Sequence, residues 1–460
     1  METSPDWAAL PAPCLLLILQ FLHDDAQSLA CAASACTVFR AAAAADHLWR
    51  SAALAAACWG ASGVQAASAL GLSSGPPRSL AAPPSWRAEL ARARAARAAV
   101  EAGTFARVDR LRGHTDFIRC LHVSGDIALT AASSTRLLDC SLKLWDLRTH
   151  ACSATLMGHT GPIWSCAWRG GDQPAVTASE DGTVKVWADL RDGTAATQTL
   201  SCPPGERQRA MHSVALSRDS TVVAAGSDAG SLLAWTLRCS DGEWTAQQLH
   251  SRTLCVGRFS ALQLSNDGTF AAWSTTGGFG VERLGPDAPP ATPLRLLTTT
   301  TLSFDESCTG ALSDTLLLGT DAGLLVMPGA LAGIRAQLGI LGRSPPVLCH
   351  QQGAMGSCDI VLVGNNDGAV ALYDVRTPSV DVVQRFKANN PVYCLQSVGP
   401  YVASGHSDGV VIVRDMRTGA ALYSDARQHR HRERVWALSL DERRLVSAGL
   451  DGDVMTREFA

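Results

Sequence analysis

The chain has 460 residues and a formal net charge of −3, with 47% hydrophobic and 18% charged residues. This length accommodates one large repeat domain and a smaller one, and the apolar fraction is too high for a chain that is disordered throughout. The small negative net charge argues against a nucleic-acid-binding protein that works by bulk electrostatics.

Cysteine usage and the first apolar run bear on the compartment. The 15 cysteines form no Cys-x-x-Cys pair, and their number is odd, so we interpret them as reduced thiols. The run 14–19 is much shorter than the ~20 residues of a membrane span, and no Lys or Arg precedes it. We therefore expect an intracellular protein, cytoplasmic and/or nuclear, and find no pattern that indicates a metal or a cofactor.

Residues 1–59 have a helical pattern. Apolar side chains recur at helical spacing through 10–22 and again through 29–37, which predicts a small all-α unit. The segment 10–22 resembles the opening of an F-box, and Val38-Phe39-Arg40 and Leu48-Trp49-Arg50 resemble its close. The alternative is a helical hairpin that packs on the domain that follows.

The F-box resemblance implies a docking surface for a Skp-type adaptor of a cullin–RING ubiquitin ligase. That surface would be apolar and would lie on the first helix. The residues that the resemblance assigns to it are Leu10, Pro11, Cys14, Leu15, Ile18, Leu19 and Leu22.

Residues 60–103 are predicted to link two domains. Residues 60–84 are rich in Ala, Gly, Ser and Pro, which favours a loop. Ser85 is a suitable N-cap for a helix near 85–101. The arginines of this helix are interpreted as a solvated surface.

A repeat dominates residues 104–460. Ser179-Glu180-Asp181-Gly182 is followed five residues later by Trp187, and similar turns recur so that their end points lie 41–48 residues apart. A period of about 40–45 residues with a turn-then-Trp signature is typical of the WD-repeat β-propeller. The successive end points are Trp145, Trp187, Trp235, Glu282, Pro328, Tyr373, Arg414 and Arg457.

Eight blades are favoured, and seven remain the alternative if residues 278–330 form one irregular blade. The strand 105–111 precedes the first blade, so we expect it to complete the last one and close the ring.

The clearest repeat contains the residues of a hydrogen-bond tetrad, as the resemblance to WD repeats implies. A buried Trp N–H needs a partner, and hydroxyl, imidazole and carboxylate can link donors to acceptors. Because the same set recurs from blade to blade, we interpret it as structural and predict no catalytic residue. The tetrad residues are His159, Ser179, Asp181 and Trp187, with His114, Asp139 and Trp145 in the first blade.

Arginines gather near the loops that enter several blades. Guanidinium groups that converge suit a phosphate or an acidic segment, because they bind such oxygens bidentately. The alternative is dispersed surface charge paired with Asp and Glu. The candidate target-binding residues are Arg119, Arg136, Arg207, Arg209, Arg258, Arg430, Arg432 and Arg434.

Taken together, the chain is similar to F-box proteins with a WD-repeat propeller. The resemblance implies a substrate-recognition subunit of a Skp–cullin–F-box ubiquitin ligase that binds a phosphorylated or acidic target protein, and no enzyme. One alternative is a WD-repeat scaffold without a ligase. Another is a receptor for a cullin-4-type ligase, because Trp145-Asp146-Leu147-Arg148, Tyr373-Asp374-Val375-Arg376 and Asp415-Met416-Arg417 resemble a WDxR box.

Overall fold

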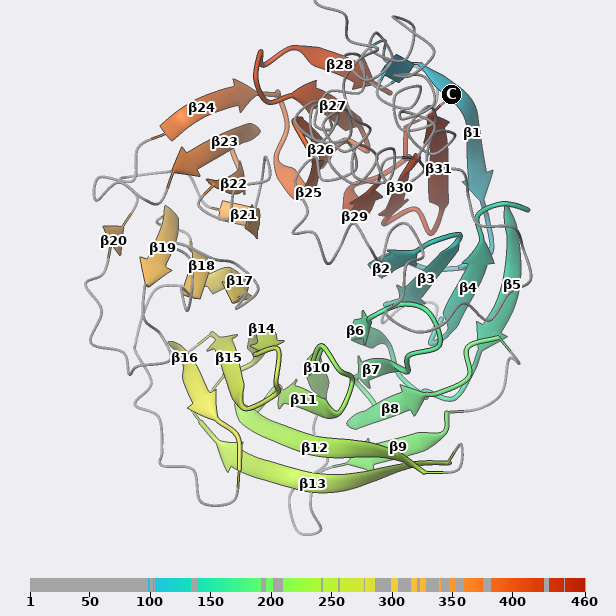
Figure 1. Ribbon diagram of the computed structural model, residues 1–460, viewed down its shortest axis with the longest axis vertical. Helices are drawn as coiled ribbons and strands as arrows, with labels where there is room; N and C mark the ends of the chain where they lie inside the picture. The colour runs from blue at the N-terminus through green and yellow to red at the C-terminus, as the bar shows by residue number, and fades with distance from the viewer. Residues whose placement is uncertain are drawn as a thin grey trace, which may run out of the picture.

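The strands form eight sheets arranged around a common axis, as the computed structural model shows (Figure 1). This confirms the mainly β fold with eight blades, and the seven-bladed alternative is wrong because the strands within 278–330 belong to two sheets. The structure describes residues 98–99, 102, 104–133, 139–191, 196–201, 210–240, 243–254, 257–276, 278–285, 299–304, 316–320, 323–327, 339–340, 347–352, 360–374, 382–425, 430–441 and 443–459.

Blades 1 to 4 are formed by consecutive antiparallel strands. Blade 1 contains β2 (Ile118–Ser124), β3 (Ile127–Ala132), β4 (Leu142–Asp146) and β5 (Ala151–Leu156). Blade 2 contains β6 (Ile163–Trp168), β7 (Ala175–Ser179), β8 (Thr183–Trp187) and β9 (Gln198–Ser201). Blade 3 contains β10 (Met211–Leu216), β11 (Val222–Ser227), β12 (Ser231–Ser240) and β13 (Glu243–Thr253). Blade 4 has three strands in the described part: β14 (Phe259–Leu264), β15 (Phe270–Thr275) and β16 (Gly278–Arg283).

Blades 5 to 8 complete the ring. Blade 5, of which only the backbone is described, contains β17 (Thr299–Phe304), β18 (Leu316–Thr320), β19 (Gly323–Met327) and β20 (Gly339–Ile340). Blade 6 contains β21 (Val347–Gln352), β22 (Ile360–Asn365), β23 (Ala369–Asp374) and β24 (Val382–Lys387). Blade 7 contains β25 (Val392–Val398), β26 (Tyr401–His406), β27 (Val411–Asp415) and β28 (Ala421–Ser424). Blade 8 contains β29 (Val435–Leu440), β30 (Arg444–Gly449), β31 (Val454–Phe459) and, from the start of the ring, β1 (Phe105–Leu111).

The core lies between neighbouring blades. Every residue of β7, β11, β26 and β30, the second strands of their blades, is buried. Each of these strands is covered on both faces by the adjacent sheets, so apart from His406 in β26 and Arg444 in β30 it consists mostly of apolar or small residues instead of a polar–apolar alternation. Between blades 2 and 3, for example, Val184 packs in one cluster with Met211 and Trp235.

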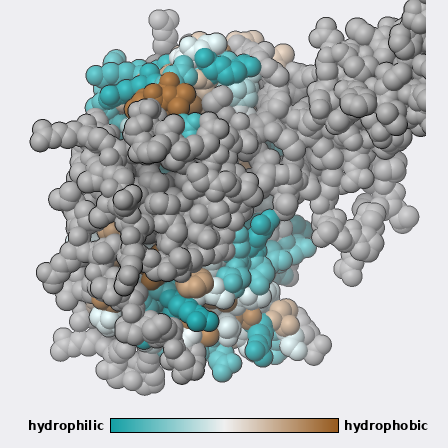
Figure 2. Space-filling model, turned by 60° about the vertical axis from the view of Figure 1, so that its left-hand side comes forward, coloured by the Kyte–Doolittle hydropathy of each residue, from teal (hydrophilic) through white to brown (hydrophobic). Residues whose placement is uncertain are grey.

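Residues of the outer strands are exposed more often than those of the second strands. Four of the six residues of β24 are exposed, and Val382 and Val383 are 49% and 59% accessible. On the face shown in Figure 2, the described surface is mainly hydrophilic and its apolar side chains gather in small separate patches. Among the described residues, no helix has the length and apolar character needed to cross a membrane.

The turn between the second and third strands of a blade depends on glycine. Gly182 and Gly409 have φ values of 81° and 83°, in the left-handed region that side chains disfavour. A Cβ on Gly409 would also collide with the carbonyl oxygen of His431 in the next blade. These turns and the loops that enter each blade lie on one face of the ring, here called the turn face, because the four strands of a blade are antiparallel.

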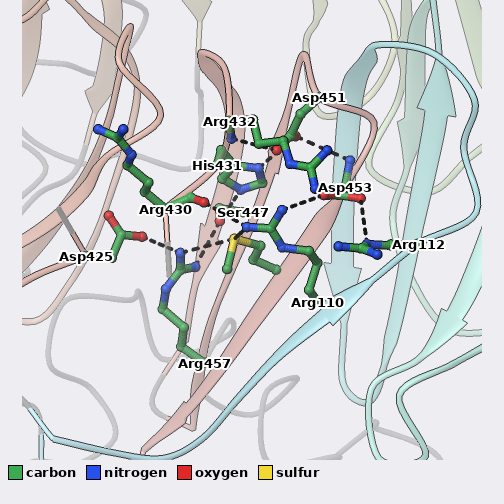
Figure 3. A network of polar contacts seen from close by, with 11 residues as sticks. Arg110, Arg112, Asp425, Arg430, His431, Arg432, Ser447, Asp451, Asp453 and Arg457 are labelled. Atoms are coloured by element: carbon green, nitrogen blue, oxygen red, sulfur yellow. Dashed lines mark hydrogen bonds and ion pairs between the residues drawn. The ribbon is translucent and has the colours of Figure 1, made fainter. Parts of the chain in front are cut away.

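Strand β1 closes the ring, as the sequence predicted. It pairs with β31 from Phe105↔Phe459 to Leu111↔Val454, although the two strands are at opposite ends of the domain. Side chains reinforce this pairing (Figure 3): Arg110 donates to Asp453 at 2.8 Å and to the carbonyl oxygen of Arg430 at 2.8 Å. The N-terminal domain 1–59, with every predicted adaptor-binding residue, and the linker up to residue 97 lie outside the described residues.

Deletion of the last ten residues removes β31 and should destabilise the whole ring, because β1 loses its only strand partner and β30 loses one of its two. We expect the melting temperature to fall by about 10 °C or more, since each kcal/mol lost from a large domain costs about 2–4 °C. Thermal melts followed by circular dichroism provide the measurement. A chain that lacks only Ala460 keeps β31 and is the control; a truncated chain that melts like this control contradicts the closure.

Candidate functional site

The predicted tetrads are present in blades 1 and 2, with one residue corrected. In blade 2, Trp187 Nε1 donates to Thr177 Oγ1 at 2.8 Å, and the same oxygen lies 2.8 Å from His159 Nε2. His159 Nδ1 lies 2.7 Å from Asp181. Ser179, assigned to the tetrad from the sequence, donates instead to the carbonyl oxygen of Gly161 at 2.9 Å.

The strand register explains this correction. Ala175 pairs with Trp187, so Thr177 is the diagonal neighbour that the indole can reach, whereas Ser179 lies two residues farther along β7. The same offset applies in blade 1, where Ala128 pairs with Trp145 and Thr130 Oγ1 accepts the Trp145 N–H at 2.8 Å.

The tetrads are structural because their hydroxyl groups are inaccessible. Thr130 and Thr177 are fully buried, so no substrate can reach them. Burial raises the pKa of Asp139, but hydrogen bonds from His114 and Ser141 outweigh it and hold the pKa well below 3.8. The ionised carboxylate therefore accepts from His114 Nδ1–H, Thr130 donates to Nε2, and the indole donates to Thr130.

Blade 8 contains a third tetrad that the sequence reasoning missed. His431 lies 2.9 Å from both Asp451 and Ser447, and Arg457 donates to Ser447 at 2.9 Å (Figure 3). The histidines of the first two blades were recognised in the pairs Gly113-His114 and Gly158-His159, whereas His431 follows an arginine. Arg457 takes the place of Trp in this tetrad. The signal that identifies the tetrad is the interval of six residues from Asp451 to Arg457, which equals that from Asp181 to Trp187.

Arg457 is fully buried and needs a counter-charge, because a buried unpaired ion is costly. Asp425, at the end of blade 7, supplies it and has no exposed side-chain surface.

Glu282 takes the Trp position in blade 4 in a similar way and pairs with Arg252. A pocket of about 340 Å³ adjoins this group and is lined by Gln248, Leu249, His250, Ser251, Arg252 and Gly285.

The predicted arginines separate into three groups. Arg136, Arg207 and Arg209 lie outside the described residues. Arg258, Arg430 and Arg432 are exposed, and so is Arg119, although it belongs to the third group. Arg119 and Arg434 come together near the axis, where both guanidinium carbons approach the ring of Trp436, at 5.1 and 5.9 Å from its centroid. The place of Arg136, Arg207 and Arg209 in the target-binding site therefore stays a prediction.

Arg119 lies between two indole rings. Its guanidinium carbon is 5.0 Å from the centroid of Trp164 and 5.1 Å from that of Trp436, within the range of cation–π attraction. Desolvation lowers the pKa of Arg119, and the charge of Arg258 lowers it further. The guanidinium stays charged at neutral pH because its ordinary pKa is above 12.

The rings continue on both sides of Arg119. Tyr393 stacks on Trp436 with centroids 5.6 Å apart, and His212 lies 5.0 Å from Trp164. We call Tyr393, Trp436, Arg119, Trp164 and His212 the axial arc; it joins blades 7, 8, 1, 2 and 3 in order. Sequence reasoning identified only Arg119 of the five, because it treated Trp164 as part of an apolar strand.

Among the described residues, no group of His, Cys, Asp or Glu side chains is suited to hold a metal ion.

Replacing Thr177 with Val should destabilise the propeller by about 1–3 kcal/mol, because the buried indole and imidazole lose their shared partner while the volume is nearly unchanged. Urea unfolding measures this. Thr199→Val is the matched control, since Thr199 is exposed on β9 and bonds Lys185. Equal unfolding free energies for the two variants would refute the bridging role.

Acidification should destabilise the fold before the carboxylates titrate. Burial lowers the pKa of His212 and of His350 to about 4, against 6.5 in the unfolded chain. Between these values the unfolded chain binds more protons, so the unfolding free energy falls as pH decreases from 6.5 to 4, by about 1 kcal/mol or more. Urea unfolding at several pH values between 6.5 and 4 measures this decrease in the unfolding free energy. His212→Gln should show a shallower decrease, and a flat profile for the unaltered chain would contradict the assignment.

Comparisons with known proteins find matches for two parts of the chain, the N-terminal segment and the start of the propeller. The family model "WD domain, G-beta repeat" matches residues 105–146 and 150–188, and the model "F-box-like" matches residues 7–55. The F-box/WD repeat-containing protein sel-10 of Caenorhabditis elegans is 30% identical over 95 residues, which cover 21% of this chain and 15% of that protein. The Set1 complex component swd1 of Schizosaccharomyces pombe is 40% identical over 68 residues, or 15% of this chain and 17% of that protein.

Solved structures share the fold. Sqt1 of Chaetomium thermophilum, bound to the N-terminus of the ribosomal protein L10, superposes with a TM-score of 0.61 at 20% identity, over 76% of this chain and 98% of that one. The designed protein Ika8 also has a TM-score of 0.61, at 23% identity. The matched segments span only 7–17% of the length of the curated relatives. The chain thus combines an F-box-like segment with a WD-repeat β-propeller.

Proposed function

We propose that the protein is a substrate-recognition subunit of a Skp–cullin–F-box ubiquitin ligase. The observation that carries this proposal is the F-box-like match at 7–55 on the same chain as a propeller. In this role the F-box-like segment docks the adaptor and the propeller holds a target protein. Such a ligase acts in the cytoplasm or the nucleus.

The mechanism needs no reacting residue in this chain. Holding the target beside the ligase raises its effective concentration at the enzyme that transfers ubiquitin. The buried tetrad hydroxyl groups support a non-enzymatic role, because the most catalytic-looking Ser, Thr, His and Asp side chains are part of the frame. A rigid ring suits this role, since loops on a stable scaffold present binding residues in a fixed arrangement.

A cullin-4-type receptor receives less support. Arg417 of one WDxR-like box is held by its own Asp415, through contacts of 3.0 and 2.7 Å. Arg148 of another is 70% exposed, with Asp126 and Asp146 at 3.8 and 3.7 Å. Arg376 lies outside the described residues. Local pairing accounts for Arg417 and Arg148 without a partner protein.

Affinity purification of the full chain from cells should capture the Skp adaptor, and deletion of residues 1–59 should abolish capture. Leu15→Asp combined with Ile18→Asp should have the same effect, because charge disrupts the apolar docking surface that the F-box resemblance implies. Immunoblotting of the purified fraction gives the readout.

The control for this purification is Arg148→Ala, which changes an exposed propeller residue and should leave adaptor capture intact. If the full chain captures no adaptor, the protein is a scaffold without a ligase. Loss of a cullin-4-type adaptor from the Arg148→Ala sample alone would favour the alternative receptor.

A further inference from the structure

The first strands of four blades contain cysteines, and these form two neighbouring pairs in the part of the chain that the structure describes. Cys120 of β2 and Cys166 of β6 lie in blades 1 and 2. Cys349 of β21 and Cys394 of β25 lie in blades 6 and 7. All four are free thiols. Because each pair lies on the first strands of adjacent blades, the second pair serves as an internal reference for the first.

In the reference pair, each thiol is held by backbone groups. Cys349 donates to the carbonyl oxygen of Val392 at 3.5 Å, and a Cβ on its cross-strand partner Gly364 would lie 2.5 Å from the sulfur. Cys394 is placed in the same way, with a carbonyl oxygen of blade 8 at 3.7 Å and a glycine opposite. These sulfur atoms therefore fill space that only glycine leaves free. Burial raises the pKa of both thiols, so they are poor nucleophiles.

Cys120 has different surroundings, because the residue opposite it is not glycine. Its cross-strand partner is the fully buried Ala131, whose methyl group takes the space that Gly364 leaves free in blade 6. The Cys120 sulfur lies 3.9 Å from the carbonyl oxygen of Trp164, which is the second residue of β6 and not the first. At this place along β6 the sulfur meets Cys166, whose thiol donates a hydrogen bond to it.

This contact makes the two thiols unequal. The hydrogen bond from the Cys166 thiol lowers the pKa of Cys120 more than burial raises it, and the charge of Arg119 and the backbone N–H of Cys166 lower it further. The same hydrogen bond and burial raise the pKa of Cys166. Cys120 is also the more accessible thiol, since it is partly buried whereas Cys166 is 7% exposed. The thiolate is the reactive form, so an oxidant meets Cys120 first.

We propose that Cys120 and Cys166 form a reversible disulfide between blades 1 and 2 when the protein meets a hydroperoxide. The two thiols are already in hydrogen-bond contact, so the fold has placed the reacting groups beside each other. The bond encloses residues 121–165 and restricts the unfolded chain, which stabilises the folded propeller. This inference concerns a covalent state of the propeller and goes beyond the proposed ligase role.

The chemistry has two steps. The Cys120 thiolate attacks one oxygen of hydrogen peroxide, the O–O bond breaks, and the hydroxide that leaves takes up a proton to become water; Cys120 is then a sulfenic acid. The Cys166 thiol attacks the sulfenic sulfur and loses its proton, the S–O bond breaks, and a second water leaves. Two glutathione molecules reverse the reaction, because they reduce the disulfide and are themselves oxidised to glutathione disulfide.

Peptide mapping of the full chain tests the proposal. The chain is treated with hydrogen peroxide, its remaining thiols are alkylated after denaturation, and tryptic peptides are analysed by mass spectrometry without reduction. We expect peptide 120–136 to be joined to peptide 149–169, and glutathione to separate them. Peptide 149–169 also contains the exposed Cys152, so Cys152→Ser should keep the link and Cys166→Ser should lose it. Cys349 and Cys394 should stay thiols under the same treatment.

Two further measurements establish the order of the steps and their effect. In the Cys166→Ser chain the sulfenic acid persists, so dimedone should label Cys120; in the Cys120→Ser chain it should leave Cys166 unlabelled. The peroxide-treated chain should melt about 5 °C higher than peroxide-treated Cys166→Ser, and glutathione should remove the difference. Cys120→Ala changes the more accessible partner, and its loss of the link covers the case in which Cys166→Ser does not fold.

Four results overturn the proposal: peptides 120–136 and 149–169 do not join, the link persists in folded Cys166→Ser or Cys120→Ala, Cys349 and Cys394 are oxidised to the same extent, or dimedone labels Cys166 before Cys120. A treated chain that melts no higher than treated Cys166→Ser also contradicts the proposed link between blades. Adaptor capture by the same preparation is a separate readout, so failure of the disulfide leaves the ligase role standing, and failure of adaptor capture leaves the disulfide standing.

Discussion

The pairing of β1 with β31 is the constraint on which the rest of the molecule depends. Each blade buries its faces against two neighbours, so a ring with an open end would expose two sheet faces and two strand edges at once. The strand Phe105–Leu111 prevents this by adding the outermost strand of a blade whose other three strands come from the end of the domain. Closure therefore joins residues that are more than 300 positions apart, such as Arg110 and Asp453.

Buried charge is concentrated near this closure. Arg457 replaces the tryptophan that blades 1 and 2 use, and its partner Asp425 belongs to the preceding blade. A Trp N–H is satisfied by one hydroxyl, whereas a guanidinium has five donors and needs more acceptors. Arg457 finds them in Ser447 and Asp425, so this substitution ties blade 8 to blade 7 through a pair that is costly to break.

The fold was predictable because its signals are local. Turn residues followed by a fixed interval mark each blade even where Trp is replaced by Glu282, Tyr373 or Arg414. The His, Asp and Trp of the blade 2 tetrad were predicted, but its hydroxyl residue was wrong. Choosing Thr177 over Ser179 requires the strand register, and the register is a property of paired strands. His431 was missed for a different reason: the preceding glycine, not the chemistry of the imidazole, had been used as the marker.

The candidate site was less predictable because a bulge changes the direction of a side chain without changing the apolar pattern. Ile163-Trp164-Ser165-Cys166 reads as an ordinary buried strand, yet the shift between Ile163 and Ser165 redirects Trp164 toward Arg119. Counting arginines near loops placed Arg119 and Arg434 among the candidates but did not pair them with each other. It could not separate Arg434 from Arg430 and Arg432, which come from the same loop and are exposed.

Closure and the axial arc are physically linked. Arg119 belongs to the first blade and Trp436 to the last, and their contact exists only because the ring is closed. Trp164 alone can stack on one side of Arg119 in an open chain, which leaves the guanidinium free to rotate; the second indole removes that freedom. The same strand pairing that stabilises the fold thus assembles the arc, so the chain presents its arranged guanidinium groups only when the whole propeller has formed.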